Sequence, residues 1–206
     1  MNLQIPAGAF RAYLFDCDGT IVDSMPLHYT AWKQALSEWG CTLDEYLFYA
    51  WGGKPPVEII ASLNRMRGLN MPVDVVAARK ESLYYSLLPG LKPVPEVLEI
   101  INAQQGRIPF AVVSGSTRES IVKSLTAVGL LDRFAILVGS EDYVRSKPAP
   151  DAFLTAADRL AIAAADCLVF EDTDMGIQGA TAAGMASVRI PQPQERRNGT
   201  GPGGIA

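Results

Sequence analysis

Hydrophobic and polar positions divide the chain into a helical segment and a segment in which short apolar runs alternate with helices. The first apolar run, Ala12 to Phe15, is bounded by polar residues and is typical of a short buried strand. From residue 25 to about residue 88, apolar residues recur at helical spacing and no strand is predicted. Within this segment, Thr42 and Glu45 have the spacing of a capping box, which favours a helix start there. The run from Pro89 to Pro93 is interpreted as a linker that ends the helical segment.

After this linker, four further apolar runs predict strands, and helical patterns separate them. The strands are expected at residues 107–113, 135–138, 167–170 and 186–190, and the helices at 119–128, 151–160 and 177–183. Short apolar strands that alternate with helices favour a parallel, doubly wound sheet with right-handed crossovers. The sequence therefore predicts an α/β protein with a Rossmann-like, five-stranded parallel core sheet and an inserted α-helical segment. The core comprises residues 1–24 and 90–191, the helical insertion comprises residues 25–89, and residues 192–206 form a Pro/Gly-rich tail that we expect to be disordered.

The composition excludes several classes of protein. With 206 residues, of which 49% are hydrophobic, the chain can bury a substantial core. The net charge is −4 and the Lys and Arg residues are scattered, so no surface for nucleic acid is predicted. The longest apolar runs are shorter than the roughly 18 residues of a membrane span, and residues 1–10 lack the pattern of a signal peptide. We therefore expect a cytoplasmic protein, a monomer or weak dimer, that binds neither nucleic acid nor membrane.

Polar groups follow several of the predicted strands. In a parallel α/β sheet, ligands bind at the carboxyl ends of the strands, so side chains that follow different strands can meet at one site. These residues are Asp16 and Asp18 after the first strand, Ser114 after the second, Lys147 in the loop after the third, and Glu171 and Asp172 after the fourth. An acid pair, a hydroxyl group, a lysine and a second acid pair are suited to binding a phosphate group and a hard cation.

This set of side chains is suited to phosphoryl transfer, which needs a nucleophile, a proton donor and neutralisation of the phosphate oxygens. Asp16 is the candidate nucleophile that would form an aspartyl-phosphate, and Lys147 would neutralise charge beside it. Asp18 is the candidate general acid and then general base. Magnesium is the expected cofactor because its candidate ligands are all oxygens: the Asp16 carboxylate, the Asp18 carbonyl, Asp172, and Glu171 directly or through water.

Ser114 and a further acid, Asp174, each have two possible interpretations. Ser114, with Gly115 and Ser116, is predicted to bind the phosphoryl group, but a serine at this position is equally suited to capping the following helix. Asp174 is as suited to capping the helix after the fourth strand as to ordering the metal site. The sequence pattern alone leaves both alternatives open.

Four segments of the sequence resemble the ordered motifs of the haloacid dehalogenase superfamily. They are DCDGT at residues 16–20, the strand-end Ser114, KPAPDAF at residues 147–153 and FEDTDMGIQGATAAGM at residues 170–185. The resemblance spans nearly the whole chain and implies that the helical insertion is a small α-helical cap that closes over the site and selects the substrate. The pattern His28-x-x-Ala31-Trp32 and the Glu-Asp pair of the fourth motif resemble the branch of β-phosphoglucomutases and sugar-phosphate phosphatases. Within the superfamily, the second aspartate, Asp18, favours phosphate esters over haloacids and phosphonates.

The resemblance leaves the roles of three cap residues open. β-Phosphoglucomutases carry an arginine in the cap loop after the glycine, where this chain has Lys54, and this difference favours hydrolysis. Lys54 is still expected to bind the substrate as a point charge, so mutase activity remains an alternative. His28 is expected to contact Asp18 or the substrate, or else to be a structural hydrogen-bonding residue. Lys80 either resembles a cap lysine of the mutases or is a solvated helix residue.

The sequence therefore predicts a magnesium-dependent phosphatase of small sugar phosphates, which acts through an aspartyl-phosphate on Asp16 with Asp18 as general acid and base. The first alternative is a β-phosphoglucomutase, which transfers a phosphoryl group between C1 and C6 of glucose phosphate. The second alternative is a catalytically idle binding or regulatory protein on the same fold, and the intact set of acids speaks against it.

Overall fold

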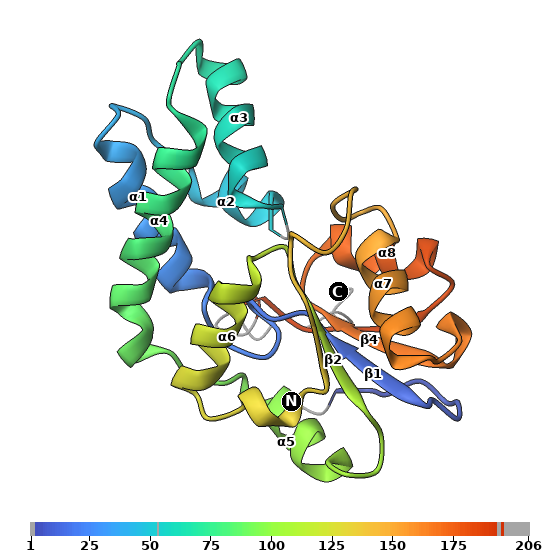
Figure 1. The fold of residues 1–206 in the computed structure, drawn as a ribbon. Coiled ribbons are helices and arrows are strands. Elements are labelled where there is room, and N and C mark those ends of the chain that lie inside the picture. Colours follow the sequence, from blue (N-terminus) through green and yellow to red (C-terminus); the bar gives the residue numbers. More distant parts are fainter. Residues whose placement is uncertain (1–2, 53, 193–194, 196–206) are drawn as a thin grey trace, which may run out of the picture.

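The computed structural model describes residues 3–52, 54–192 and 195, and shows a parallel sheet with a helical cap at one end (Figure 1). Its strands are β1 (Ala12–Phe15), β2 (Phe110–Val113), β3 (Ile136–Val138), β4 (Cys167–Glu171) and β5 (Ala186–Arg189). All strand pairings are parallel, in the order β3-β2-β1-β4-β5. The predicted α/β fold with a five-stranded parallel sheet is therefore confirmed. The predicted tail at residues 192–206 lies outside the described residues, apart from Gln192 and Glu195.

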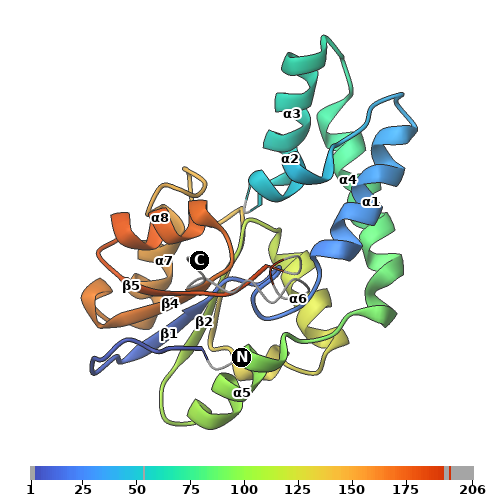
Figure 2. The ribbon, with the colours of Figure 1, turned by 180° about the vertical axis from the view of Figure 1, so that it is seen from behind.

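Helices cover both faces of the sheet (Figure 2). They are α5 (Pro95–Gln104), α6 (Arg118–Ala127), α7 (Asp151–Leu160) and α8 (Asp174–Ala182). Tyr13 and Phe15 of β1 belong to a buried cluster with α5 and α6, whereas Ala12 and Leu14 belong to a second cluster with α7 and α8. Because successive strand residues face opposite sides of a sheet, a strand that is covered on both faces must be apolar throughout. This explains the continuous apolar runs in the sequence.

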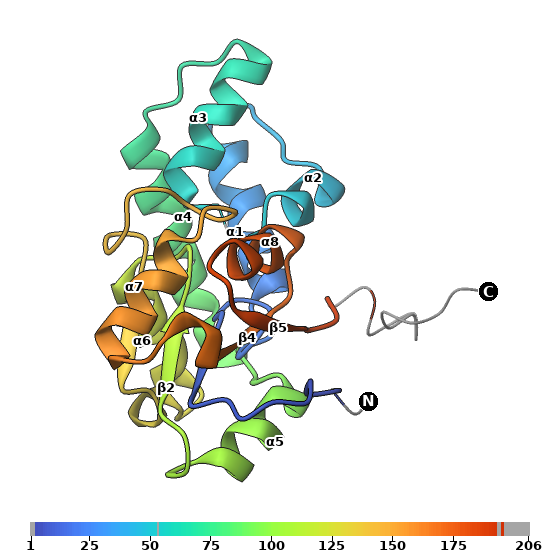
Figure 3. The same ribbon diagram turned by 90° about the vertical axis from the view of Figure 1, so that its right-hand side faces the viewer.

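The cap comprises four helices and stands over one end of the sheet (Figures 1 and 3). They are α1 (Met25–Ser37), α2 (Glu45–Ala50), α3 (Pro56–Arg67) and α4 (Val73–Leu87). Their common core includes the buried side chains of Trp32, Phe48 and Ile60. Ala31 and Ala35 of α1 are fully buried beside α4, and their small side chains allow the two helices to pack closely. None of the helices in the described part of the chain is both long and apolar enough to cross a membrane.

The chain passes between the sheet and the cap at two neighbouring points. It leaves the core after β1 and returns just before α5. The backbone N–H of Val94 donates a hydrogen bond to the carbonyl oxygen of Ile21 at 2.9 Å, and the N–H of Asp23 donates to the carbonyl oxygen of Lys92 at 2.8 Å. The two crossing segments are therefore joined by backbone hydrogen bonds.

Two features differ from the elements predicted by the sequence. Helix α5 is not among the predicted helices, although it follows directly on the segment interpreted as a linker. The second cap helix begins at Glu45 with Asp44 as its N-cap, so the predicted cap at Thr42 is wrong. The Oδ1 atom of Asp44 accepts hydrogen bonds from the N–H groups of Tyr46 and Leu47, which satisfies two donors of the first turn.

Candidate active site

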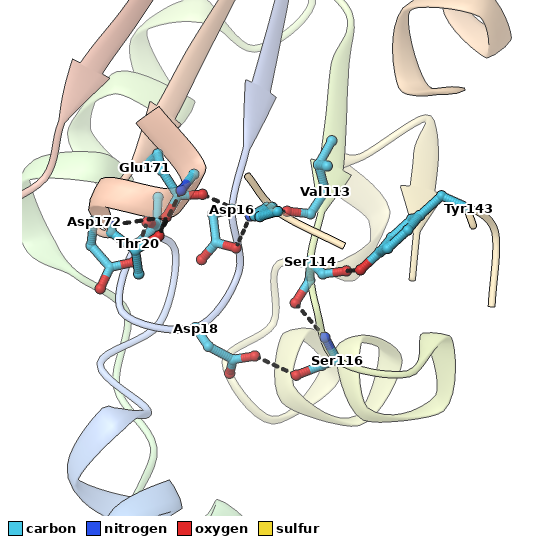
Figure 4. A network of polar contacts seen from close by, with 12 residues as sticks. Asp16, Asp18, Thr20, Val113, Ser114, Ser116, Tyr143, Glu171 and Asp172 are labelled. Atoms are coloured by element: carbon cyan, nitrogen blue, oxygen red, sulfur yellow. Dashed lines mark hydrogen bonds and ion pairs between the residues drawn. The ribbon is translucent and has the colours of Figure 1, made fainter. Parts of the chain in front are cut away.

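The side chains predicted to share a site lie at the carboxyl ends of neighbouring strands (Figure 4). Asp16 follows β1, Ser114 follows β2, and Glu171 is the last residue of β4. Asp172 comes directly after it, and Lys147 lies in the loop between β3 and α7. Because β2, β1 and β4 are adjacent in the sheet, their ends bring these loops together. All five side chains are buried.

Lys147 is the centre of this buried group. Its Nζ atom donates hydrogen bonds to Oδ1 of Asp16 and to Oε2 of Glu171, both at 2.7 Å, and to the carbonyl oxygen of Val113 at 3.1 Å. Burial disfavours the ammonium form, but the charges of Asp16 and Glu171 outweigh this effect and raise the pKa of Lys147. Lys147 is therefore a permanent cation that fixes two carboxylates relative to each other.

Glu171 is held at both of its carboxylate oxygens. Oε2 accepts the hydrogen bond from Lys147, and Oε1 accepts hydrogen bonds from the N–H and the hydroxyl group of Thr173 at 2.9 and 2.8 Å. A Cβ atom at Gly176 would overlap the carboxyl group of Glu171, so only glycine leaves room for this side chain. Thr173, rather than Asp174, caps α8 by accepting a hydrogen bond from the N–H of Gly176 at 3.0 Å. These contacts fix the orientation of Glu171.

Asp16, Glu171 and Asp172 form an acidic cluster with the composition of a metal site. One carboxylate oxygen of each residue lies within 4.8 Å of the others. The Oδ2 atom of Asp172 is buried and has no hydrogen-bond partner among the described residues, whereas Oδ1 accepts a hydrogen bond from the Thr20 hydroxyl at 3.3 Å. Oxygen ligands of this kind suit Mg²⁺. A divalent cation would satisfy the orphaned oxygen of Asp172, so the residues present fit such an ion.

Lys147 alone does not balance the negative charge of this cluster. Burial and repulsion from the two other acids raise the pKa of Asp16 well above its ordinary value, although Lys147 acts in the opposite direction. Burial and repulsion from Glu171 raise the pKa of Asp172 to about 8, against the attraction of the nearby cations. A divalent cation among the three acids would lower the pKa values of Asp16 and Asp172 and keep both ionised.

The side chain of Asp18 is directed toward Ser116 and the cap (Figure 4). Its Oδ1 atom accepts hydrogen bonds from the Ser24 hydroxyl at 2.7 Å and from Nε2 of His28 at 2.9 Å. Its Oδ2 atom accepts a hydrogen bond from the Ser116 hydroxyl at 2.7 Å. Burial disfavours the charged form, but His28 and these hydrogen bonds outweigh it and hold the pKa of Asp18 well below its ordinary value. Asp18 is therefore ionised in this arrangement, and the expected contact with His28 is present.

A cap lysine supports His28 from its other side. The Nζ atom of Lys80 lies 2.9 Å from Nδ1 of His28 and donates to Oε1 of Glu81 at 2.7 Å. Because an ammonium group can only donate, Nδ1 accepts this hydrogen bond and Nε2 carries the proton that His28 donates to Asp18. The ring of His28 is stacked on Tyr84, with 3.8 Å between the ring centres. Lys80 is 3% exposed, so its interpretation as a solvated helix residue is wrong.

The loop after β2 is shaped by contacts of Ser114. Its hydroxyl group accepts a hydrogen bond from the N–H of Ser116 at 3.1 Å, and its carbonyl oxygen accepts one from the hydroxyl group of Tyr143 at 3.2 Å. Thr117 caps α6 by accepting a hydrogen bond from the N–H of Ser120 at 3.2 Å. The interpretation of Ser114 as the helix cap is therefore wrong, and its side chain lies at the edge of a cavity instead.

This cavity has a volume of about 60 Å³ and separates the strand ends from the cap. Its lining includes Asp16, Asp18, Ser114, Gly115 and Ser116 from the core, and His28, Lys54, Lys80, Trp32, Phe48 and Trp51 from the cap. The residues predicted to bind the substrate therefore all face one cavity. The Nζ atom of Lys54 lies 5.1 Å from the centre of the Trp51 ring. This volume is smaller than the roughly 300 Å³ or more that is typical of ligand pockets.

Several residues that fix the site are absent from the predicted set. They are Thr20, Ser24, Tyr143 and Thr173. Three of them are hydroxyl residues close in sequence to a predicted acid, and short hydroxyl side chains near an acid are the signal that could have identified them. Tyr143 offers no such signal, because it contacts a backbone carbonyl group of a loop that is distant in sequence.

Comparisons with known proteins indicate a family of hydrolases. The family model of the haloacid dehalogenase-like hydrolases matches residues 10–184 of this chain. The chain is 34% identical over 182 residues to fructose-1-phosphate phosphatase YqaB from Escherichia coli (strain K12), covering 88% of this chain and 96% of that protein. It is 28% identical over 193 residues to beta-phosphoglucomutase from Bacillus subtilis (strain 168), covering 89% of this chain and 84% of that protein. The fold is similar to the crystal structure of beta-phosphoglucomutase from Clostridium difficile, with a TM-score of 0.79, 23% identity, and coverage of 86% of this chain and 83% of that one.

Proposed function

Because this chain belongs to the family of haloacid dehalogenase-like hydrolases, we propose that it is a magnesium-dependent phosphatase of small sugar phosphates that acts through an aspartyl-phosphate on Asp16. The observation that carries this proposal is the buried ion group in which Lys147 donates to Asp16 and Glu171 at 2.7 Å each, at the end of the cavity. The similarity to a fructose-1-phosphate phosphatase supports sugar phosphates as the substrate class.

Two aspartates would divide the chemistry. The Asp16 carboxylate attacks phosphorus while the ester P–O bond breaks, and the departing oxygen takes a proton from Asp18. Asp18 then accepts a proton from water, which attacks phosphorus, and the bond between phosphorus and Asp16 breaks to release phosphate. The ionised Asp18 described above is suited to the second step. For the first step it must be protonated, so its hydrogen bonds to His28 and Ser116 would have to change when the substrate binds.

The acidic cluster would hold the cofactor. Asp16, Glu171 and Asp172 supply carboxylate oxygens, and the Asp18 carbonyl is the further ligand that we propose. Bound Mg²⁺ would supply positive charge for the phosphoryl oxygens. Ser114, with Gly115 and Ser116, would bind those oxygens from the other side, and Lys54 would contact the sugar or a second phosphate.

A screen of phosphorylated sugars tests the proposal by measuring release of inorganic phosphate with Mg²⁺ present. We expect turnover by the wild type, and loss of about 10³-fold or more in Asp16→Asn or in excess chelator, because the nucleophile or the cation is then absent. Asp158→Asn is the matched control, since Asp158 is exposed on α7. Full phosphate release by Asp16→Asn would contradict the proposal.

A β-phosphoglucomutase is the second candidate. It is favoured by the similarity to the Bacillus subtilis enzyme and by Lys54 in the cavity, which could contact a second phosphate group. Conversion of β-glucose 1-phosphate to glucose 6-phosphate, primed by glucose 1,6-bisphosphate, would establish it. Release of free phosphate alone would remove it. Absence of turnover across the whole panel would instead favour an idle binding protein.

A further inference from the structure

A second, larger cavity lies on the other side of the cap loop. Its volume is about 750 Å³, within the range of small-molecule sites, and it is bounded by α2 of the cap and by α8 and the end of β5 of the core. Figure 3 shows α2 above α8 on the side of the molecule where β5 ends. The lining residues that matter here are Tyr46, Tyr49, Thr173, Asp174 and Arg189. The proposed phosphatase reaction uses none of them as a catalytic group.

Arg189 gives this cavity hydrogen-bond donors. Its Nη1 atom is buried and has no hydrogen-bond partner within the described residues. It lies 3.3 Å from Oδ1 of Asp174, and Nη2 lies 3.9 Å from Oε1 of Glu195. Both distances exceed the roughly 2.7–2.9 Å of a charge-assisted hydrogen bond. The guanidinium group therefore retains donor capacity that a ligand could use.

The charges around Arg189 favour a neutral ligand over an anion. Asp174 and Glu45 also line the cavity, and together they outweigh the single positive charge of Arg189. An anionic ligand would be repelled by both carboxylates, whereas a ligand rich in hydroxyl groups can accept from Arg189 and donate to Asp174. The side chain of Asp174 is 87% exposed, so it is accessible for such a contact.

The cap side of the cavity offers an aromatic surface. Tyr46 on α2 is 83% exposed, so its ring is accessible to a ligand in the cavity. Such a ring can pack against the apolar face of a pyranose while its hydroxyl group stays polar. From the aromatic ring of Tyr46 on the cap side and the donor Arg189 beside the acceptor Asp174 on the core side, we propose that this cavity binds a neutral saccharide unit.

The saccharide has two possible sources. It is either the distal unit of a phosphorylated disaccharide, whose phosphate is at Asp16, or a free sugar. Gly52 lines both cavities, and a Cβ atom there would lie 2.9 Å from Cγ2 of Thr173, so the cap loop touches the core between the two cavities. A phosphorylated disaccharide would reach both cavities only after this loop and Thr173 separate, whereas a free sugar needs no such movement. Only the first source rests on the proposed phosphatase function.

Calorimetric titration with trehalose, a neutral disaccharide, tests the proposal without requiring turnover. We expect binding to the wild type, about tenfold weaker binding to Tyr46→Ala because an aromatic contact is lost, and retained binding to the matched control Tyr46→Phe. Asp174→Ala should also weaken it, through loss of an acceptor. Absence of binding to the wild type, or equal affinity of all four proteins, would overturn the proposal.

Turnover then distinguishes the two sources. If the saccharide is part of the substrate, Tyr46→Ala lowers kcat/KM for trehalose 6-phosphate about tenfold and leaves fructose 1-phosphate unchanged. If it is a free sugar, added trehalose changes the KM for fructose 1-phosphate in the wild type and not in Tyr46→Ala. Should no sugar phosphate be hydrolysed, the phosphatase proposal fails while the titration still decides whether the cavity binds a saccharide.

Discussion

The ammonium group of Lys147 holds two carboxylates of the acidic cluster, those of Asp16 and Glu171, together in the core. Lys147 is fully buried, and two of the acids accept hydrogen bonds directly from it. Removing one partner of a buried ion group leaves the others uncompensated, which costs more than the group contributes when complete. We therefore expect Lys147 to contribute to stability in addition to its proposed neutralisation of charge beside Asp16.

We predict that Lys147→Met lowers the free energy of unfolding by about 3 kcal/mol, because Asp16 and Glu171 are left buried beside each other without a cation. Urea unfolding measures this difference. Lys92→Met is the matched control, since Lys92 is exposed and substitutions of exposed residues usually change stability by about 0.5 kcal/mol or less. Equal stability of Lys147→Met and the control would contradict the prediction.

The sequence predicts which acids converge but not how each is oriented. The apolar runs of the sequence indicate the strands and where each one ends, and Asp16, Glu171 and Asp172 meet because β1 and β4 are neighbours in the sheet. The contact of Lys80 with His28 joins residues 52 positions apart on two different cap helices. Only the packing of α1 on α4 creates it, so a pattern along the chain cannot show that Lys80 is buried.

Among the elements, α6, α7 and the loop after β3 are tied together by Asp142. Its carboxylate accepts hydrogen bonds from Arg118 on α6 and Arg159 on α7, at 2.6 to 2.7 Å, and from the N–H of Gly139 at 2.9 Å. Burial disfavours its charge, but these donors outweigh it and lower the pKa of Asp142 to about 2. One carboxylate thereby connects helices on opposite faces of the sheet.

We predict that Asp142→Asn lowers the free energy of unfolding by about 2 kcal/mol near neutral pH. The pKa of Asp142 is lower in the folded than in the unfolded chain, so its contribution is fully present above about pH 4 and is lost as the pH falls toward about pH 2. The difference between wild type and variant should therefore shrink by about half at pH 3. Urea unfolding at both pH values measures it, with Asp158→Asn as control, and a difference independent of pH would count against this account.

Helix α5 shows why an element can be overlooked in the sequence. The run from Pro89 to Pro93 favours a linker, yet α5 begins two residues after it, with Pro95 in its first turn, where a missing N–H costs nothing. Val97 and Ile101, four residues apart, form the buried face of the helix. The helical spacing of apolar residues is therefore present in the sequence, and Pro95 lies at the start of this helix.

At the scale of the whole molecule, an ion at the acidic cluster would join the ends of β1 and β4 and raise the free energy of unfolding. A ligand that binds only the folded chain stabilises it by about 2.7 kcal/mol when its concentration is a hundred times its Kd. Such an ion would coordinate Oδ2 of Asp172, which is buried and has no hydrogen-bond partner in the part of the chain that the structure describes.

We predict that Mg²⁺ raises the Tm of the wild type and not that of Asp172→Asn, because the variant lacks a ligand carboxylate. In chelator, the variant should be at least as stable as the wild type, since one buried like-charge repulsion is removed. Thermal unfolding with and without Mg²⁺ measures both effects. Asp174→Asn is the matched control, because Asp174 is exposed and lies outside the cluster. The same Mg²⁺ shift in Asp172→Asn as in the wild type would argue against the metal site.

The two segments that connect the core to the helical insertion, Ile21–Asp23 and Lys92–Val94, are hydrogen-bonded to each other. The insertion could therefore be replaced by another one without changing the core. Because backbone hydrogen bonds hold the two ends of the insertion next to each other, a different segment between these ends would leave the register of the strands unchanged. If the protein is the phosphatase proposed above, residues that contact the leaving group and residues that carry out the phosphoryl transfer would lie in separate segments of the chain, and each set could change without the other.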